Sequence, residues 1–248
     1  MSGTAHADEA SVSNLLARSD TEVLSLYRYK PFYFLLGSPD TKIQISFKAK
    51  ILRETELYIG YSQIMMWDIF KTSAPMRDLN YNPEIFYRFS LSDRRPEQWL
   101  DFGIYEHESN GLAGDGSRSW NRTSLRYHSS TTFTHDSRLL WSIKAWIPYL
   151  YDSTSPDIPK YRGVWELNME FCNIMGGFVQ PGDVLLRIYP GGASYTNPLK
   201  GGQEITLRMK SRWQGFLMPI MVQFFHGYAE SLLNYNQETM ALRAGIGF

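Results

Sequence analysis

Three things are scarce in this chain, and each scarcity excludes a class of protein. Cys172 is the only cysteine among 248 residues, so no disulfide forms within the chain and a disulfide scaffold is excluded. The 25 basic residues are balanced by 25 acidic ones, so no basic surface favours nucleic acid as a partner. No stretch approaches the roughly 18 consecutive apolar residues of a membrane-spanning helix. The most apolar run, 216–225, is too short and contains Pro219.

The beginning of the chain is small and polar, without the apolar core of a signal peptide. The chain is therefore either a cytosolic protein or a mature exported form with an added initiator methionine, and the strand pattern described next favours the second. We expect residues 1–20 to form a loosely held segment. Because the composition does not shift along the chain, we expect residues 21–248 to form one domain.

Aromatic residues are abundant, at 15% of the chain, although 20% of the residues are charged and the mean hydropathy is -0.33. Apolar and polar residues alternate with a period of two, which indicates strands with one dry and one wet face. The clearest stretches are 43–51, 165–171, 205–210 and 240–248. No helical period of convincing length is present, so the sequence predicts an all-β fold.

Turn signals divide the chain into twelve predicted strands. They lie near residues 24–36, 43–53, 55–69, 83–92, 98–109, 118–133, 138–150, 162–173, 184–190, 203–213, 216–229 and 239–248. An even number of antiparallel strands can close into a barrel, and closure removes exposed edges.

Alternation alone leaves open which face is inside. In a soluble barrel or sandwich the apolar face is the core, whereas in an outer-membrane barrel it meets lipid. Three features favour the membrane: the polar faces carry charges of both signs, such as Lys48 and Glu166, aromatic residues gather near strand ends, and the chain ends on Phe248 while its last strand still alternates. We therefore expect a twelve-stranded antiparallel transmembrane β-barrel.

One stretch suggests chemistry. His107 and Ser109 are two residues apart on a predicted strand, so they share a face and place a general base beside a hydroxyl nucleophile. Asn121, on the next predicted strand, could orient the imidazole. A lone His-x-Ser pair is common by chance, so the interpretation depends on context.

The context is a family resemblance. The sequence resembles outer-membrane phospholipase A, the calcium-dependent lipase of Gram-negative bacteria, at His107-Glu108-Ser109-Asn110-Gly111 and Ser117-Arg118-Ser119-Trp120-Asn121-Arg122. Further similar motifs are Ser73-Ala74-Pro75-Met76-Arg77, Asn80-Tyr81-Asn82-Pro83, Gly227-Tyr228-Ala229-Glu230-Ser231-Leu232 and Tyr235-Asn236. The resemblance extends from about residue 60 to the C-terminus. Near the start, this chain has Pro31-Phe32 where the family usually has an asparagine before an aromatic residue.

The resemblance implies a barrel in the bacterial outer membrane that hydrolyses acyl ester bonds of glycerophospholipids on its outer wall and is active as a homodimer. It implies that Ser109 is the nucleophile, His107 the general base and Asn121 the residue that holds the imidazole. It also implies that the backbone N–H of Gly111 stabilises the oxyanion.

The resemblance implies a calcium ion as well, with hard oxygen ligands. These would be the carbonyl of Leu112, the hydroxyl of Ser117 and the carbonyl of Ser73 from a second subunit. This chain departs from the family at two places. Leu112 replaces a basic residue, and the acidic residue of the loop is shifted, since Gly114 stands at the matching position and Asp115 one later.

Gln63 is the one amide on the apolar face of the predicted strand 57–67. An unpaired amide facing lipid is costly, and a hydrogen bond to its counterpart across a two-fold axis would offset that cost. Gln63 matches the interface glutamine of the family. The alternative is an amide that lies near the lipid headgroups.

Two predictions disagree on which face of its strand His107 occupies. Simple alternation puts Phe102 and Ile104 on the face opposite His107 and Ser109, which would turn the site into the lumen, whereas the family site faces outward. We therefore predict a β-bulge near Gly103 or Tyr105 that resets the register.

The remaining candidates have simpler interpretations. Glu106 and Glu108 lie on the face opposite His107 and are predicted to face the lumen, and the other histidines lack the spacing of metal ligands. Two other functions fit the alternation: a non-enzymatic outer-membrane barrel, either a small porin or a structural protein, and a soluble β-sandwich that binds a partner.

Overall fold

The structure is a computed structural model that describes residues 25–52, 54–175, 182–213 and 216–248. The predicted loosely held segment 1–20 lies outside the described residues. In the described part, the strands are β1 (Leu26–Arg28), β2 (Tyr33–Ser38), β3 (Thr41–Lys50), β4 (Leu57–Trp67), β5 (Met76–Ser90), β6 (Trp99–Ser109), β7 (Ser119–Thr132), β8 (Arg138–Tyr149), β9 (Trp165–Met175), β10 (Gly182–Gly191), β11 (Asn197–Trp213), β12 (Phe216–Gly227) and β13 (Thr239–Gly247). A 3₁₀ turn, η1 (Gly114–Gly116), and a short helix, α2 (Pro159–Arg162), lie between strands.

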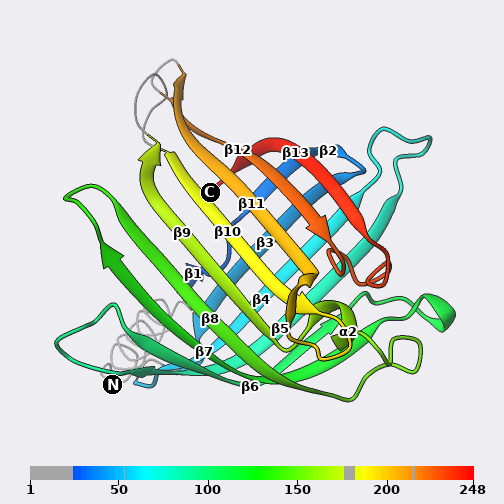
Figure 1. Cartoon of the computed structure of the whole chain (residues 1–248), viewed down its shortest axis with the longest axis horizontal. Coiled ribbons are helices and arrows are strands. Elements are labelled where there is room, and N and C mark those ends of the chain that lie inside the picture. Colours follow the sequence, from blue (N-terminus) through cyan, green and yellow to red (C-terminus); the bar gives the residue numbers. More distant parts are fainter. Residues whose placement is uncertain (1–24, 53, 176–181, 214–215) are drawn as a thin grey trace, which may run out of the picture.

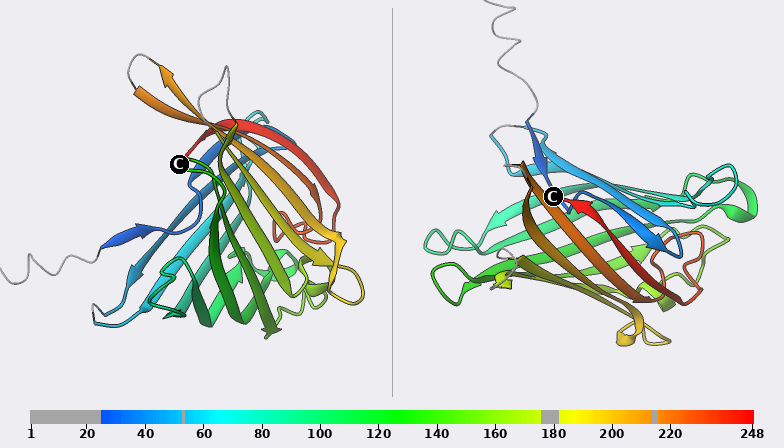
Figure 2. Two further views of the ribbon diagram at one scale, coloured as in Figure 1. Left: turned by 60° about the vertical axis from the view of Figure 1, so that its left-hand side comes forward. Right: turned by 90° about the horizontal axis from the view of Figure 1, so that it is seen from above.

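The strands form one closed antiparallel sheet (Figure 1). Each strand from β3 to β13 pairs with the next, and β13 pairs with β2 to close the ring. β1 and β2 both pair with β3 and together form the first strand of the barrel, which is interrupted between them. The predicted all-β, twelve-stranded antiparallel barrel is confirmed, and Figure 2 shows it from two further sides.

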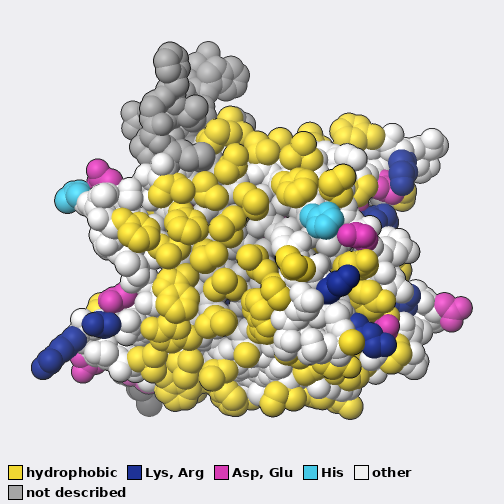
Figure 3. Space-filling model, in the orientation of Figure 1, with side chains coloured by type: hydrophobic (Ala, Val, Ile, Leu, Met, Phe, Trp, Pro, Cys, Tyr) yellow, Lys and Arg dark blue, Asp and Glu magenta, His cyan; other side chains and the backbone are white. Residues whose placement is uncertain are grey.

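The two faces of the sheet have the polarity predicted for a membrane barrel. Charged and polar side chains are buried inside, among them Lys42, Asp101, Glu106, Lys144 and Arg243. Large apolar side chains are exposed on the outside, and they cover most of the wall visible in Figure 3. A soluble sandwich would bury the apolar face instead, so this arrangement contradicts the β-sandwich alternative. None of the described helices has the length and apolarity needed to cross a membrane.

Loops fill one end of the barrel. The loop between β12 and β13 and the region around α2 lie at the same end in Figure 1. Their residues Ile158, Leu232 and Tyr235 pack around Trp120 and Trp146, which are buried side chains of β7 and β8. This end of the lumen therefore has a small apolar core of its own, directly behind the strand that carries Asn121.

The predicted β-bulge is present in β6. The register shifts between Gly103 and Glu106 on the β7 side of the strand. Ile104 and Tyr105 are consecutive, yet both are exposed, at 45% and 42%, whereas Glu106 is 2% exposed. A Cβ at Gly103 would clash with the Ser124 hydroxyl, so glycine permits the close approach of β6 to β7 here. The bulge turns His107 to the outer face and confirms the prediction.

Candidate active site

His107 and Asn121 meet on the outer wall of the barrel. They are directly opposite each other on β6 and β7, and Nδ1 of His107 lies 2.9 Å from Oδ1 of Asn121. The amide nitrogen of Asn121 donates to the carbonyl of Leu150 at 3.1 Å, which leaves its oxygen facing the ring. Because that oxygen is an acceptor, Nδ1 of His107 carries the proton and Nε2 is free to accept one.

Tyr105 is a third member of this arrangement that the sequence did not reveal. Its hydroxyl donates to Oδ1 of Asn121 at 2.8 Å, and its ring lies parallel to that of His107, with centroids 6.5 Å apart. The bulge explains its position, since it places residue 105 on the same outer face as residue 107. The predicted bulge was the signal that could have identified it.

Ser109 is the last residue of β6 and lies two residues after His107, on the same face. Its partners across the sheet are Tyr81 on β5 and Ser119 on β7. Within the described ranges, its hydroxyl forms no hydrogen bond, to His107 or to any other group. The structure therefore joins His107 with Asn121 directly and places Ser109 beside them without a hydrogen bond.

Asn110 shapes the loop that follows Ser109. Its amide donates to the carbonyl of Gly116 at 2.8 Å, and its side-chain oxygen accepts from the backbone N–H of Arg118 at 2.9 Å. Gly111 has a φ of +67°, and a Cβ there would lie 3.0 Å from the ring of Tyr81. In the part of the chain that the structure describes, the N–H of Gly111 has no acceptor, so it is available to an oxyanion.

The hydroxyl of Ser117 donates to Oδ2 of Asp152 at 2.5 Å, and the backbone N–H of Thr154 donates to Oδ1 at 3.0 Å. The hydrogen bonds from Ser117 and Thr154 lower the pKa of Asp152 to about 2, so its carboxylate is charged at neutral pH. Asp152 lies in the loop after β8, and the sequence did not identify it as a site residue.

The carbonyl oxygens of Leu112 and Ser73 are the other predicted ligands. Both residues are exposed in loops at the Ser109 end of the barrel, and neither carbonyl accepts a hydrogen bond from the described residues. Ser73 has a positive φ of 64°. The side chain of Asp115 is exposed and also has no partner among those residues.

These groups are all oxygens, and they fit a hard cation such as calcium. Across the described residues, no group of three or more His, Cys, Asp or Glu is gathered as a metal site. A cation in this loop would therefore depend on carbonyl and hydroxyl oxygens, with Asp152 as the nearby carboxylate.

Gln63 lies on the outer face of β4, as predicted. Its side-chain oxygen accepts a hydrogen bond from the Tyr61 hydroxyl at 2.9 Å. Its NH₂ group has no acceptor among the residues described, so two donors face outward without a partner in a single chain.

The predicted lumen residues point inward. Glu106 and Glu108 each accept from Arg122 at 2.7 Å.

The other described histidines each lie beside a carboxylate. His128 contacts Asp101 at 3.0 Å, His135 contacts its neighbour Asp136, and His226 lies 3.3 Å from Glu238. Each of these histidines thus has a single carboxylate neighbour.

Comparisons with known proteins identify relatives of this chain. Phospholipase A1 of Klebsiella pneumoniae is 30% identical over 227 residues, which cover 84% of this chain and 69% of that protein. Phospholipase A1 of Escherichia coli K12 is 28% identical over 219 residues, with 84% and 68% covered. A Neisseria meningitidis relative is 29% identical, and the chain spans only 54% of its length.

Two solved structures share the fold. The crystal structure of the Salmonella typhi outer membrane phospholipase dimer with bound calcium matches with a TM-score of 0.73 at 23% identity, covering 92% of this chain and 93% of that one. Outer membrane phospholipase A from Escherichia coli matches with a TM-score of 0.74 and the same identity and coverage. The family model of phospholipase A1 matches residues 36–248, and the chain therefore belongs to the phospholipase A1 family.

Proposed function

We propose that this chain is a calcium-dependent phospholipase of the bacterial outer membrane that hydrolyses acyl ester bonds of glycerophospholipids and is active as a homodimer. The observation that carries the proposal is the 2.9 Å contact between His107 and Asn121, with Ser109 on the same outer face of the barrel. On this wall a phospholipid acyl chain would arrive from the side. Membership of the phospholipase A1 family supports the same activity.

In the proposed reaction, Ser109 attacks the ester carbonyl while Nε2 of His107 takes the hydroxyl proton. The proton then passes to the alkoxide of the leaving lysophospholipid, and an acyl-enzyme remains on Ser109. Water, deprotonated by the same nitrogen, attacks the acyl carbonyl. The bond to the Ser109 oxygen then breaks, the proton passes from His107 to that oxygen, and the fatty acid is released. Asn121 accepts the Nδ1–H throughout and keeps the ring in one tautomer and orientation.

A neutral amide suits this position. A carboxylate would offset the charge of the imidazolium better, but a charged group beside lipid is costly to desolvate. Asn121 is 7% exposed. The amide therefore orients the ring without introducing a charge into the membrane wall.

The oxyanion of the tetrahedral intermediate would be bound by the free N–H of Gly111. When bound, calcium would add positive charge near this oxyanion. The groups that would hold it are the carbonyl of Leu112, the hydroxyl of Ser117, the carboxylate of Asp152, and the Ser73 carbonyl of a second copy of the chain.

The dimer follows from the same assignment, because the set of ligands is completed by a second copy. The unpaired NH₂ group of Gln63 supports an interface along β4, the strand that leads into the loop of Ser73. Such a hydrogen bond between two subunits is worth about 1 kcal/mol in a membrane.

Release of fatty acid from phospholipid in detergent tests the function. We expect calcium-dependent hydrolysis by the wild type, loss of hydrolysis in Ser109→Ala, and wild-type rates in Ser119→Ala. Ser119 is the matched control, because it lies directly opposite Ser109 on β7. Equal rates for the wild type and Ser109→Ala would instead favour the alternative of a non-enzymatic barrel, a small porin or a structural protein.

A further inference from the structure

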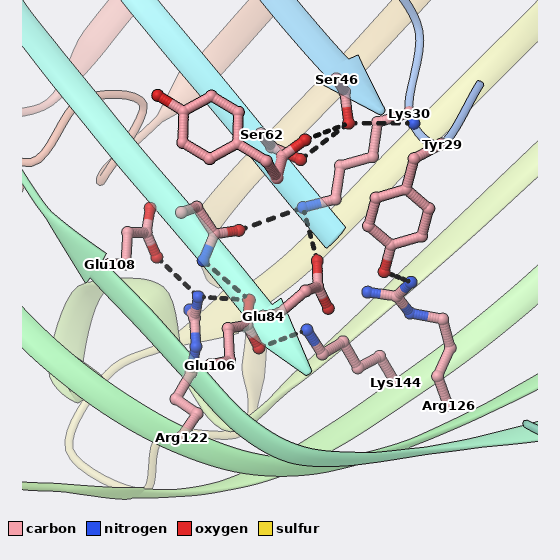
Figure 4. Close-up of polar contacts among 12 residues, drawn as sticks. Tyr29, Lys30, Ser46, Ser62, Glu84, Glu106, Glu108, Arg122, Arg126 and Lys144 are labelled. Carbon is pink, nitrogen blue, oxygen red and sulfur yellow. Dashed lines mark hydrogen bonds and ion pairs between the residues drawn. The ribbon is translucent and has the colours of Figure 1, made fainter. Parts of the chain in front are cut away.

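The first barrel strand is broken where the sequence departs from the family pattern. β1 and β2 both pair with β3, but the four residues 29–32 lie opposite only the two residues 45–46. Pro31 lacks the N–H that a continuous ladder would use. In a regular strand, consecutive side chains face opposite sides of the sheet. Here Tyr29 and Lys30 both project into the lumen (Figure 4).

Contacts inside the barrel hold this break in place. The hydroxyl of Ser46 accepts from the backbone N–H of Lys30 at 3.2 Å. The Tyr29 hydroxyl accepts from Arg126 at 2.6 Å, and its ring stacks on that of Phe86 with centroids 5.6 Å apart. The break is therefore a built feature of the lumen.

The ammonium group of Lys30 is linked to the backbone of the proposed general base through one side chain. It donates to Oδ1 of Asn82 at 3.1 Å. The amide nitrogen of Asn82 in turn donates to the carbonyl of His107 at 2.9 Å and to Glu106 at 3.2 Å. Asn82 thus ties the first strand to the part of β6 that presents the site.

Lys30 also balances a buried charge. Glu84 and Glu106 are directly opposite each other on the inner face of β5 and β6, where like charges destabilise a sheet. Glu106 is paired with Arg122 and Lys144. Among the described residues, Lys30 is the only cation within ion-pair distance of Glu84, at 3.5 Å. Without Lys30, Glu84 would be a buried charge without a counterion.

The contacts of Lys30 matter because they lie beside the register shifts of β5 and β6. The register of β6 shifts immediately before Glu106 on the β7 side, and that of β5 shifts immediately after Ile85 on the β6 side. The register beyond a bulge decides which face each side chain occupies. Contacts that hold Glu106 and the His107 carbonyl therefore hold His107 and Ser109 on the outer face.

We propose that Lys30 is a positioning residue for the phospholipase reaction. From the lumen, it acts through Asn82 and Glu84 of β5 on the bulged strand β6. The inference rests on the proposed function. Lys30 touches neither the substrate nor the reacting atoms, so its effect is on the turnover of a correctly folded barrel rather than on lipid binding.

Steady-state kinetics of Lys30→Met and Lys30→Arg test the proposal. We expect Lys30→Met to lower kcat about tenfold, or about 1.4 kcal/mol, with KM within about twofold of the wild type, and Lys30→Arg to restore most of kcat. Lys48→Met is the matched control with kcat unchanged. Lys48 is also a lumen lysine, and its ammonium lies over the rings of Tyr58 and Tyr29. Among the residues described, it forms no hydrogen bond or ion pair with Asn82 or Glu84. The gel mobility of unheated and heated samples verifies that each barrel is folded.

Hydrogen exchange at residues 104–109 supplies a second measurement. These amides should exchange faster in Lys30→Met and in Asn82→Ala, and at the wild-type rate in Lys48→Met. Asn82→Ala keeps the ion pair of Lys30 with Glu84, so it tests the link if Lys30→Met does not fold. If the folded Lys30→Met and Asn82→Ala variants have wild-type kcat and wild-type exchange rates, and Ser109→Ala is inactive, the inference is overturned. Activity retained in Ser109→Ala would instead overturn the proposed function itself.

Discussion

His107 and Asn121 lie directly opposite each other across β6 and β7, with Nδ1 and Oδ1 2.9 Å apart, just beyond the bulge between Gly103 and Glu106 that changes the register of β6. The contact exists because the bulge turns His107 outward, onto the face that Asn121 already occupies. It therefore joins the fold to the proposed chemistry: without the irregular strand, the imidazole would face a lumen filled with ion pairs.

The first prediction concerns Asn121. A hydrogen bond to a charged partner contributes about 1.5–3 kcal/mol, so Asn121→Ala should lower kcat about 10- to 100-fold by releasing the imidazolium. KM should stay near its wild-type value, because Asn121 does not contact lipid in the proposed reaction. An unchanged kcat would show that the contact with His107 has no role in turnover.

The second prediction concerns Tyr105, whose hydroxyl shares the oxygen of Asn121 with His107. A neutral hydrogen bond contributes about 0.5–1.5 kcal/mol, so Tyr105→Phe should lower kcat about 2- to 10-fold, less than Asn121→Ala. The loss is smaller because the bond to the Leu150 carbonyl still fixes the amide. Tyr127→Phe is the control, since Tyr127 packs on Trp141 of the same sheet, away from Asn121. Equal losses in the two variants would contradict a specific role of Tyr105.

The third prediction concerns calcium. Asp152→Asn removes the carboxylate beside Ser117, so it should weaken calcium binding about tenfold or more, measured by calcium titration of dimer crosslinking. Asp115→Asn is the matched control, because that side chain is exposed and has no partner among the described residues. If Asp115→Asn has the larger effect, the ligand assignment is wrong.

The same carboxylate predicts a pH dependence. Hydrogen bonds hold the folded pKa of Asp152 at about 2, below the ordinary value of about 3.9. A lowered folded pKa contributes stability that is fully present above about pH 4 and is lost as the pH falls through about 2. The contribution of Asp152 to calcium binding should therefore be constant from about pH 5 to 8. A wild-type calcium affinity that falls across this range, together with a constant affinity in Asp152→Asn, would contradict the assignment.

The fourth prediction concerns Gln63. Gln63→Ala should weaken calcium-induced dimerisation about fivefold in crosslinking, in line with roughly 1 kcal/mol for a hydrogen bond within the membrane. Gln203→Ala on β11 is the control, because the amide of Gln203 donates to the carbonyl of Pro198 in its own chain. If Gln63→Ala does not affect dimerisation, the amide has no role in the interface and the alternative position near the lipid headgroups is favoured.

Much of the fold could be predicted because alternation has a physical cause, namely one wet and one dry face. The errors occurred where single residues imitate strand ends. β5 begins at Met76 and not near 83, because Pro83 within the strand resembles a stop. β11 begins at Asn197 and not near 203, because Gly201 and Gly202 resemble a turn. The strand predicted at 24–36 is interrupted, and contacts in the lumen compensate for the ladder hydrogen bonds that it lacks.

Some residues of the candidate site could also be predicted from the sequence, and others could not. His107 and Ser109 could be identified because two residues on one strand face define a local geometry, and the conflict with Phe102 predicted the bulge. The pair of Ser117 and Asp152 could not be predicted, because 35 residues separate the two and only the register of β7 on β8, which places Asn121 opposite Tyr149, brings their loops together.

The most direct test of the central claim, that Ser109 is a nucleophile activated on the outer wall, is covalent labelling. A fluorophosphonate with a long alkyl chain should add one label to the folded protein with calcium, and peptide mass spectrometry should locate it on Ser109. Labelling should be lost in Ser109→Ala, strongly slowed in His107→Ala and unchanged in Ser119→Ala. A label on another residue, or wild-type labelling of Ser109→Ala, would contradict the account.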